Sequence, residues 1–228
     1  MNSNLMTVSR SGHSAPEMPK LKKPLNLFLK RAFDILASST LIVLFLPLMA
    51  VVAMAIMVQD GRPIFFGHRR IGRAGKPFNC WKFRTMARDA DVQLKLLLAS
   101  DPKARKEWEE TRKLKNDPRI IPGIGHFLRR SSMDELPQLF NVLLGEMSMV
   151  GPRPVILDEL DLYGSARAHY ISVRPGLTGP WQIGDRNDED YGERVRKDVS
   201  YVENWTFGGD VQIILRTARV PFESRGAY

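Results

Sequence analysis

Residues 35–58 form an apolar run without a charged side chain, ILASSTLIVLFLPLMAVVAMAIMV, and this run limits the folds open to the chain. It is longer than the ~20 residues that a helix needs to cross a bilayer. Because the run is apolar on every face, a buried core helix is the weaker alternative. A cleaved signal peptide fits poorly, since the run begins late and shows no clear small-residue cleavage site. The run therefore predicts a segment placed in a membrane.

Pro47 lies in the middle of this run, where it would break or kink a helix. Each half, at ~1.5 Å per residue, covers only ~18 Å, which is less than the ~30 Å of the hydrocarbon core. Positive charge also flanks the run on both sides, whereas a spanning helix usually has lopsided charge. These flanking residues are Lys30 and Arg31 before the run and Arg62, Arg69, Arg70 and Arg73 after it. We therefore expect a re-entrant helix–break–helix that returns to the side it left, which leaves residues 15 and 70 on one face.

The net charge of +9 calls for an anionic partner, which could be nucleic acid, an acidic membrane surface or a phosphorylated substrate. Residues 20–31 are basic and amphipathic, and we expect them to lie on anionic headgroups. Residues 1–19 lack apolar periodicity and are expected to form a disordered tail. The single cysteine, Cys80, has no nearby Cys or His, so it is expected to be a buried structural thiol.

After the apolar run, Phe78, Trp81 and Phe83 alternate with Lys82 and Arg84, which predicts a short strand or hairpin. The two cationic ends would share one face and could clamp a phosphate. The pattern alone favours the other interpretation, a strand edge protected by charge. Helices are expected over residues 89–115, interrupted at Asp101-Pro102, and over 155–170, 190–201 and 201–220. Residues 173–187 are rich in Gly and Pro and are expected to form a structured loop of the kind that lines sites.

The stretch between residues 129 and 154, RRSSMDELPQLFNVLLGEMSMVGPRP, joins two adjacent carboxylates to several cations. Asp134 and Glu135 stand at a predicted helix start, where Ser132 would cap the free amides and Glu135 would reach back to complete a capping box. Acidic residues at a helix start are often there for stability alone. A nucleophile or metal ligand beside phosphate-binding cations needs the same combination. On spacing alone the two interpretations are equal.

Together these stretches closely resemble the bacterial sugar transferase family, the monotopic phosphoglycosyl transferases that load a polyprenyl phosphate carrier. The matching runs are KRAFDILASS at residues 30–39, R-x-G-x-x-G-x-x-F-x-x-x-KFRTM at 70–86, LRRSSMDELPQLFNVLLGEMSMVGPRP at 128–154, RPGLTGPWQ at 174–182 and YVENWTFGGD at 201–210. The resemblance covers residues 30–217 in order, in the compact form of the family without an extra multi-span region. Its pattern differs at Asp185, where the family usually has glycine, which puts the local turn and a sugar or nucleotide contact in doubt.

The resemblance implies an α+β, predominantly helical enzyme, in which a re-entrant membrane helix joins a compact catalytic domain with a small β-hairpin. It divides the chain into a tail (1–19), an interfacial and re-entrant segment (20–62), the phosphoglycosyl transferase domain (63–200) and a C-terminal helical or interfacial segment (201–228). The family's site falls on Asp134 as nucleophile and on Glu135, which with Asp134 would hold Mg²⁺. Phosphate-binding positions are Lys82, Arg129 and Arg153, with Arg84 and Arg174 as weaker candidates.

The implied reaction moves a hexose-1-phosphate from a UDP-sugar to undecaprenyl phosphate through an aspartyl-phosphosugar, with release of UMP, as the first step of exopolysaccharide synthesis. Galactose-1-phosphate is expected, partly from the tail SRGAY at residues 224–228, and glucose is the alternative. The implied place is the cytoplasmic face of a bacterial inner membrane, against anionic lipids, with a homodimer possible and no nucleic acid. A basic nucleic-acid binder would not explain the Asp-Glu pair. A non-catalytic membrane scaffold would not explain the clustered site.

Overall fold

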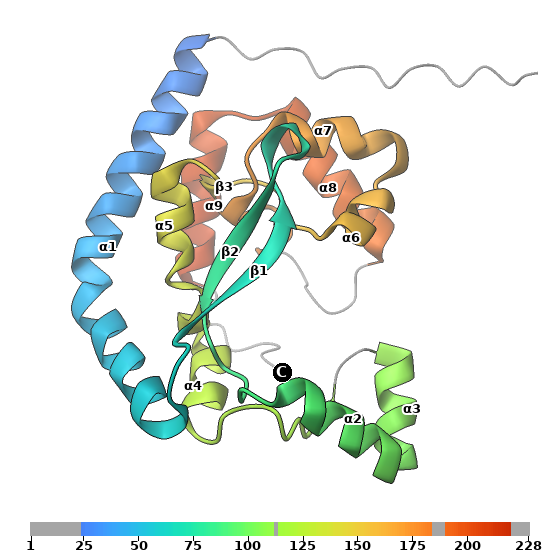
Figure 1. The fold of residues 1–228 in the computed structure, drawn as a ribbon. Coiled ribbons are helices and arrows are strands. Elements are labelled where there is room, and N and C mark those ends of the chain that lie inside the picture. Colours follow the sequence, from blue (N-terminus) through green and yellow to red (C-terminus); the bar gives the residue numbers. More distant parts are fainter. Residues whose placement is uncertain (1–23, 112–113, 184–189, 220–228) are drawn as a thin grey trace, which may run out of the picture.

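The computed structural model describes residues 24–111, 114–183 and 190–219, and most of these residues are helical (Figure 1). Within these ranges the strands form two small two-stranded sheets. The predominantly helical class with a small hairpin is confirmed. The expectations for residues 1–23, for Asp185 and for the 224–228 tail lie outside the described residues.

Helix α1 (Pro24–Asp60) carries the whole apolar run, and by length and composition it could cross a membrane. It continues through Pro47 and curves along one side of the domain (Figure 1). The helix–break–helix expected around Pro47 is therefore one continuous, curved helix. A helix can accommodate the ring and the missing N–H of a proline by bending. The re-entrant path stays a prediction.

One face of α1 packs on the domain along the length of the helix. Asp34 and Ser38 are buried in its first half, and Met49, Val52 and Ile56 in its second half. The other face is apolar but exposed. Its most exposed large side chains are 62–81% accessible: Val43, Leu44, Val51, Met54, Val58 and, nearer the start, Leu25, Phe28 and Leu36. The helix thus joins the domain with one face and leaves a long apolar surface on the other.

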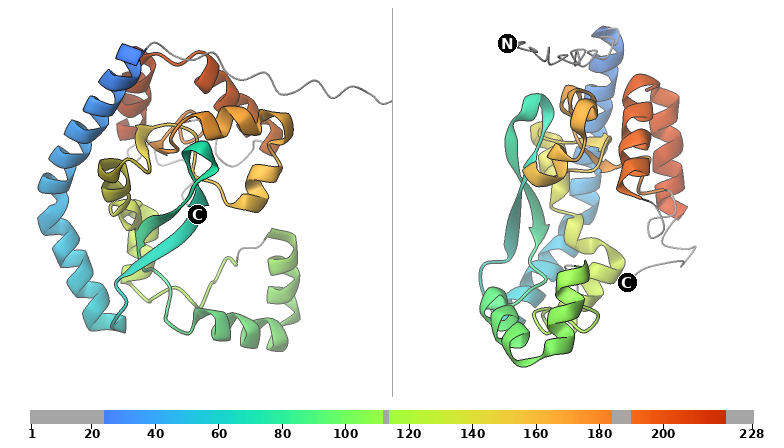
Figure 2. Two further views of the ribbon diagram at one scale, coloured as in Figure 1. Left: turned by 45° about the horizontal axis from the view of Figure 1, so that its top comes forward. Right: turned by 90° about the vertical axis from the view of Figure 1, so that its right-hand side faces the viewer.

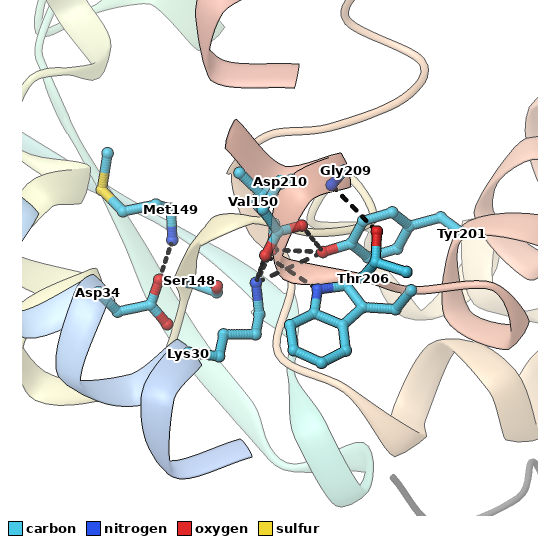
Figure 3. A network of polar contacts seen from close by, with 10 residues as sticks. Lys30, Asp34, Ser148, Met149, Val150, Tyr201, Thr206, Gly209 and Asp210 are labelled. Atoms are coloured by element: carbon cyan, nitrogen blue, oxygen red, sulfur yellow. Dashed lines mark hydrogen bonds and ion pairs between the residues drawn. The ribbon is translucent and has the colours of Figure 1, made fainter. Parts of the chain in front are cut away.

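Polar contacts fasten the first part of α1 to three other elements, and Figure 3 shows those made by Lys30 and Asp34. Lys30 Nζ lies 2.6 Å from Asp210 Oδ2 in helix α9 (Phe207–Arg219). Asp34 accepts hydrogen bonds from the hydroxyl of Ser148 (3.0 Å) and the amide of Met149 (2.9 Å) in strand β3 (Ser148–Val150). Arg31 donates to the carbonyls of Val142 and Leu143 at the end of helix α5 (Gln138–Leu144), where helix carbonyls run short of backbone donors. The Val142 carbonyl also accepts from the amide of Gly145 (3.0 Å).

The predicted hairpin is confirmed. Strands β1 (Phe65–Ile71) and β2 (Pro77–Phe83) pair antiparallel, with Phe66 opposite Lys82, and join through the 3-10 turn η1 (Arg73–Gly75). Figure 2 shows this hairpin lying along the domain at some distance from helices α2 (Ala90–Ser100) and α3 (Pro102–Thr111). The predicted interruption at Asp101-Pro102 separates these two helices. Cys80 on β2 is buried as expected, and burial raises the pKa of its thiol to about 11.

The core forms where α5, β2, β3 and α9 meet, around Phe78, Leu139, Val142, Met147 and Ile213. Strand β3 pairs parallel with β4 (Gly176–Thr178), a second sheet that the sequence patterns did not indicate. The two backbones pass so closely that a Cβ on Gly176 would lie 2.1 Å from the amide nitrogen of Gly151. Glycine is required there because no side chain would fit.

The helix expected over residues 155–170 is three short elements, α6 (Leu157–Asp161), η3 (Gly164–Ala166) and α7 (Arg167–Ser172). That single-helix prediction is wrong, because Gly164 adopts φ +50° and turns the chain. A separate small core of Val155, Leu160, Tyr163 and Tyr170 holds these pieces together. Helices α8 (Tyr191–Glu203) and α9 then pack on the domain, as predicted for this region.

Candidate active site

Three charged side chains from two elements meet at one point. Lys82 comes from β2, and Asp134 and Glu135 come from the 3-10 helix η2 (Met133–Glu135), which follows helix α4 (Ile124–Ser131). Lys82 Nζ lies 2.6 Å from Glu135 Oε1 and 3.6 Å from Asp134 Oδ2. The side chains of Asp134, Lys82 and Glu135 are 13%, 31% and 40% exposed. The cluster is therefore open to a ligand, with Asp134 the most enclosed member.

Asn141 fixes the distance between the strand and the turn that carry this cluster. It is fully buried on α5, directly after the acidic turn. Its Oδ1 accepts a hydrogen bond from the amide of Trp81 (3.0 Å), and its Nδ2 donates to the carbonyl of Asn79 (2.8 Å). These bonds hold Asn79 and Trp81, which precede Lys82 on β2, against α5. The position of Lys82 thus depends on the Asn141 side chain as well as on the pairing of β2 with β1.

The capping box expected between Ser132 and Glu135 is absent. Ser132 adopts a left-handed conformation (φ 56°) between α4 and η2, and its side chain makes no cap. Glu135 does not reach back, because its carboxylate is taken by the ammonium of Lys82. A charged donor is stronger than a neutral amide, which explains this outcome. The pair of carboxylates is thereby turned toward the hairpin.

Burial raises the pKa of Asp134 above its ordinary value. The positive charges of Lys82 and Arg129 act in the opposite direction, whereas the negative charge of Glu135 raises the pKa further. Arg129 lies close enough to interact with the Asp134 carboxylate, and its Nε donates to the hydroxyl of Thr85 (3.0 Å). The site thus holds a partly desolvated carboxylate between two cations.

Arg153 lies on the side of the cluster next to Glu135. Its guanidinium carbon is 5.1 Å from the centre of the Trp181 ring. Burial lowers the pKa of Arg153, and the charge of Arg194 lowers it further, while Glu135 favours the protonated form. Lys82, Arg129, Arg153, Asp134 and Glu135 are thus brought into one electrostatic group.

The two weaker candidates, Arg84 and Arg174, are engaged elsewhere. Arg84 is 7% exposed, pairs with Asp60 and donates to the carbonyls of Gly61, Pro63 and Met86. Those contacts hold the end of α1 against the hairpin. Arg174 donates its Nε to the carbonyl of Gly145 (2.7 Å), and Arg31 and Arg73 are the cations near it. Neither contacts the Lys82 cluster through these bonds, so neither enters the site proposed below.

Sequence reasoning missed Asn141 and Arg194. Asn141 lies inside the central motif, where an amide within an apolar helix should have indicated a required bond. Arg194 lies in a strongly charged helix, YGERVRKDVSYVE. In the sequence it differs from the exposed Arg196 only in the face of the helix on which it falls.

The carboxylate pair fits one kind of magnesium site. Mg²⁺ prefers oxygen ligands, and proteins usually hold it with one or two carboxylates together with substrate phosphates. Asp134 and Glu135 supply two carboxylates. In the described part of the chain, no group of three or more potential metal ligands occurs. The donors therefore suit an ion whose coordination a bound phosphate completes.

With this geometry in place, comparison with known proteins identifies the class. The family described as "Bacterial sugar transferase" matches residues 25–224, which is most of the chain. The chain belongs to this family, as its motifs predicted.

Three relatives show the range of names within the family. The chain is 50% identical over 208 residues to the "Undecaprenyl-phosphate galactose phosphotransferase" of Salmonella typhimurium, covering 91% of this chain and 43% of that protein. It is 47% identical over 213 residues to the "Exopolysaccharide production protein ExoY" of Rhizobium meliloti, covering 93% and 94%. It is 36% identical over 227 residues to the "UDP-glucose:undecaprenyl-phosphate glucose-1-phosphate transferase" of Klebsiella pneumoniae, covering 95% and 45%. The chain thus spans less than half of the first and third relatives.

Proposed function

We propose that this protein transfers a hexose-1-phosphate from a UDP-sugar to undecaprenyl phosphate, with release of UMP, in exopolysaccharide synthesis. The observation that carries the proposal is the Asp134 carboxylate, which is 13% exposed and faces Lys82 at 3.6 Å. Such a carboxylate is short of hydration and oriented by a cation, which suits a nucleophile. The name of the Salmonella relative agrees with sugar-phosphate transfer to undecaprenyl phosphate, and the name of the Rhizobium relative agrees with exopolysaccharide synthesis.

In the first step, an oxygen of Asp134 attacks the sugar-bearing phosphorus of the UDP-sugar. The bond from this phosphorus to the bridging oxygen breaks, UMP leaves with that oxygen, and the sugar phosphate stays on Asp134 as an acyl phosphate. In the second step, a phosphate oxygen of undecaprenyl phosphate attacks the same phosphorus. The acyl phosphate bond then breaks, which forms the sugar diphospholipid and restores the carboxylate. One difficult reaction between two anions is thus divided into two easier ones.

The cations of the site have separate tasks in this scheme. Lys82 lies against both carboxylates and would neutralise the phosphoryl oxygens during each attack. Arg129 and Arg153 would bind the phosphates on either side. Mg²⁺ held by Asp134 and Glu135 would neutralise the diphosphate and favour departure of UMP. Glu135 would also assist the attack of the lipid phosphate.

For helix α1 we propose a re-entrant position at the cytoplasmic face of the inner membrane, and the contacts at its two ends support a return to the side it left. Its start is fastened through Lys30 to Asp210, and its end through Asp60 to Arg84, so both ends bind one domain. A helix that crossed the bilayer would carry its ends to opposite sides. Only the exposed apolar face would then enter the lipid, with the flanking cations on anionic headgroups. Labelling of cysteines placed at positions 15 and 70 tests this path, because labelling from opposite faces would contradict it.

For the sugar we propose galactose. The Salmonella relative is named for galactose, and at 50% identity it is more similar to the chain than the Klebsiella relative named for glucose, at 36%. Purified protein should be offered UDP-galactose, UDP-glucose and UDP-N-acetylated sugars in parallel, with UMP as the readout. We expect most UMP from UDP-galactose, and none with Asp134→Asn or Asp134→Ala or after EDTA. Full activity of either variant, or in EDTA, would overturn the mechanism.

A further inference from the structure

Arg194 on α8 is a buried cation whose best hydrogen-bonding edge is empty. It is 7% exposed, and its Nε and Nη2 are buried with no hydrogen-bond partner among the residues that the structure describes. These two nitrogens form the side of the guanidinium fork that binds a carboxylate or a phosphate through two parallel bonds. A buried donor without an acceptor is costly. An anion with two acceptor oxygens would satisfy both nitrogens.

Arg119 shows how the same group looks when its partner belongs to the chain. It is also 7% exposed, and its face lies 4.9 Å from the centre of the Trp108 ring. Its Nε and Nη2 donate to Asp117 Oδ1 (2.8 Å) and Oδ2 (2.7 Å). Arg194 has the aromatic contacts, with Trp181 at 5.3 Å and Tyr191 at 5.2 Å, but no such carboxylate bond.

A second arginine makes the empty edge part of a larger site. The guanidinium carbons of Arg153 and Arg194 lie 5.1 Å and 5.3 Å from the centre of the same Trp181 ring. The charge of Arg194 acts on Arg153 and disfavours its protonated form, so the two cations repel each other, and burial increases the effect. An anion between them would relieve the repulsion and supply the missing acceptors. Arg153 also interacts with Glu135, which connects this pair to the Lys82 cluster.

We propose that Arg194, together with Arg153, binds the phosphate that leaves with the nucleotide. This inference rests on the proposed function. Lys82 and Asp134 are assigned to the sugar-bearing phosphate, so the neighbouring phosphate of a UDP-sugar must lie just beyond them. That phosphate gains negative charge as its bond breaks, and two guanidinium groups stabilise this charge. UMP is the free ligand of this site.

Asp198, one turn along α8, is the competing partner. It lies near enough to interact with Arg194, and its Oδ1 has no hydrogen-bond partner, while Tyr163 donates to its Oδ2 (2.7 Å). In the described residues no ion pair joins Asp198 to Arg194. If Asp198 were the partner, Asp198→Asn and Arg194→Met would destabilise the protein equally and leave nucleotide binding unchanged.

The test is calorimetric titration of the full chain in nanodiscs with UMP, which requires no turnover. Loss of a charged double hydrogen bond predicts about 10-fold or greater weakening of UMP binding in Arg194→Met. Arg194→Lys, which keeps the charge but loses the fork, should fall between Met and wild type. The matched control is Arg196→Met, since Arg196 lies on the same helix, is exposed and pairs with Glu193. It should bind UMP within about twofold of wild type, the change expected of a surface ion pair.

Three results would overturn the inference. They are unchanged UMP binding in Arg194→Met, a raised KM for undecaprenyl phosphate alone, which would assign the site to the lipid phosphate, and loss of binding in Arg196→Met as well. If Arg194→Met does not fold, Arg194→Lys and Asp198→Asn decide the matter, because only the former should weaken UMP binding. Release of UMP from UDP-sugar by the wild type tests the proposed function separately. If UMP binding depends on Arg194 but the wild type releases no UMP from UDP-sugar, the inference about Arg194 is supported and the proposed function is contradicted.

Discussion

The molecule holds two lysine–carboxylate clusters whose closest contacts are equal in length but whose surroundings differ. Lys30 lies 2.6 Å from Asp210, and Lys82 lies 2.6 Å from Glu135. Asp210 is 1% exposed, and its oxygens also accept from Trp205 (2.9 Å) and lie 2.8 Å from the Tyr201 hydroxyl (Figure 3). The Lys82 cluster has two carboxylates for one lysine and stays partly exposed.

We interpret the Lys30 cluster as structural and the Lys82 cluster as the reactive one of the proposed mechanism. In the Asp210 cluster every acceptor has a donor from the protein, so the charges only hold α1 against α9. In the Asp134 cluster the ammonium group of Lys82 is shared between two carboxylates, Asp134 and Glu135. Asp134 is the more buried of the two, and its burial raises its pKa. An incompletely neutralised carboxylate of this kind is available to a substrate.

Asp134→Asn should lower the rate of UMP release by at least roughly 10³-fold, because the amide cannot form the acyl phosphate. It should not lower the melting temperature. Burial raises the pKa of Asp134, so the folded protein binds this proton more tightly than the unfolded chain, and the ionised carboxylate lowers stability above that pKa range. An amide has no charge to desolvate. UMP assays and thermal unfolding of one preparation measure both effects, and a clear drop in melting temperature would contradict the contrast.

Asp210→Asn should behave in the opposite way. Removing the acid leaves Lys30 without its buried counter-charge, which costs about 3–5 kcal/mol of unfolding free energy. Activity per folded molecule, measured well below the melting temperature, should persist. The matched control is Asp161→Asn, whose carboxylate is 63% exposed beside Arg167, and which should cost less than about 1 kcal/mol. Equal losses of unfolding free energy in Asp210→Asn and Asp161→Asn would contradict a structural role of Asp210.

Lys82→Met should reduce UMP release by about 10²–10³-fold, the usual effect of losing one donor that stabilises developing charge. Its effect on stability should be small, since the pair with Glu135 is partly exposed and screened by solvent. Lys106→Met, which breaks an exposed pair with Glu110, is the control. A large loss of stability with normal turnover would make Lys82 a structural residue like Lys30.

Asp198 offers the smallest and most specific test, since it is buried without an ion pair. Burial raises its pKa to about 6 against an ordinary value of 3.8, with the Tyr163 hydroxyl and Arg194 acting against the rise. The folded protein therefore holds the proton more tightly, so Asp198 contributes less stability as pH rises from about 4 to about 6. The unfolding free energy of wild type minus that of Asp198→Asn should fall across this window and then level off. Urea unfolding measures it, and a difference that grows with pH would contradict the assignment.

Much of the fold could be predicted from the sequence because its signals are local. The apolar run gave α1, the alternation around Trp81 gave the hairpin, and Asp101-Pro102 separated α2 from α3. The parallel pair of β3 and β4 could not be predicted, since each is three residues long and pairs only with a distant partner. The helix expected over residues 155–170 failed because a single glycine, Gly164, reverses the backbone.

The candidate site could be predicted in part for a similar reason. Asp134, Glu135 and the arginines around them lie in one motif, and the resemblance added Lys82. The capping box failed because Lys82, distant in the chain, competes for Glu135. Arg84 stays an untested candidate, and its alternation with aromatic residues could not reveal that it contacts Asp60 and several carbonyls. Arg194 required the structure, because the sequence does not show which of the two arginines of α8 is buried by tertiary packing.

The central claim is that Asp134 carries the sugar phosphate. Wild-type protein should be incubated with UDP-galactose in the absence of lipid acceptor and analysed by intact-protein and peptide mass spectrometry. We expect the peptide that contains Asp134 to gain the mass of one hexose phosphate. This adduct should disappear when undecaprenyl phosphate is added, and it should never form in Asp134→Asn. Release of UMP with no adduct, or an adduct on another residue, would contradict it.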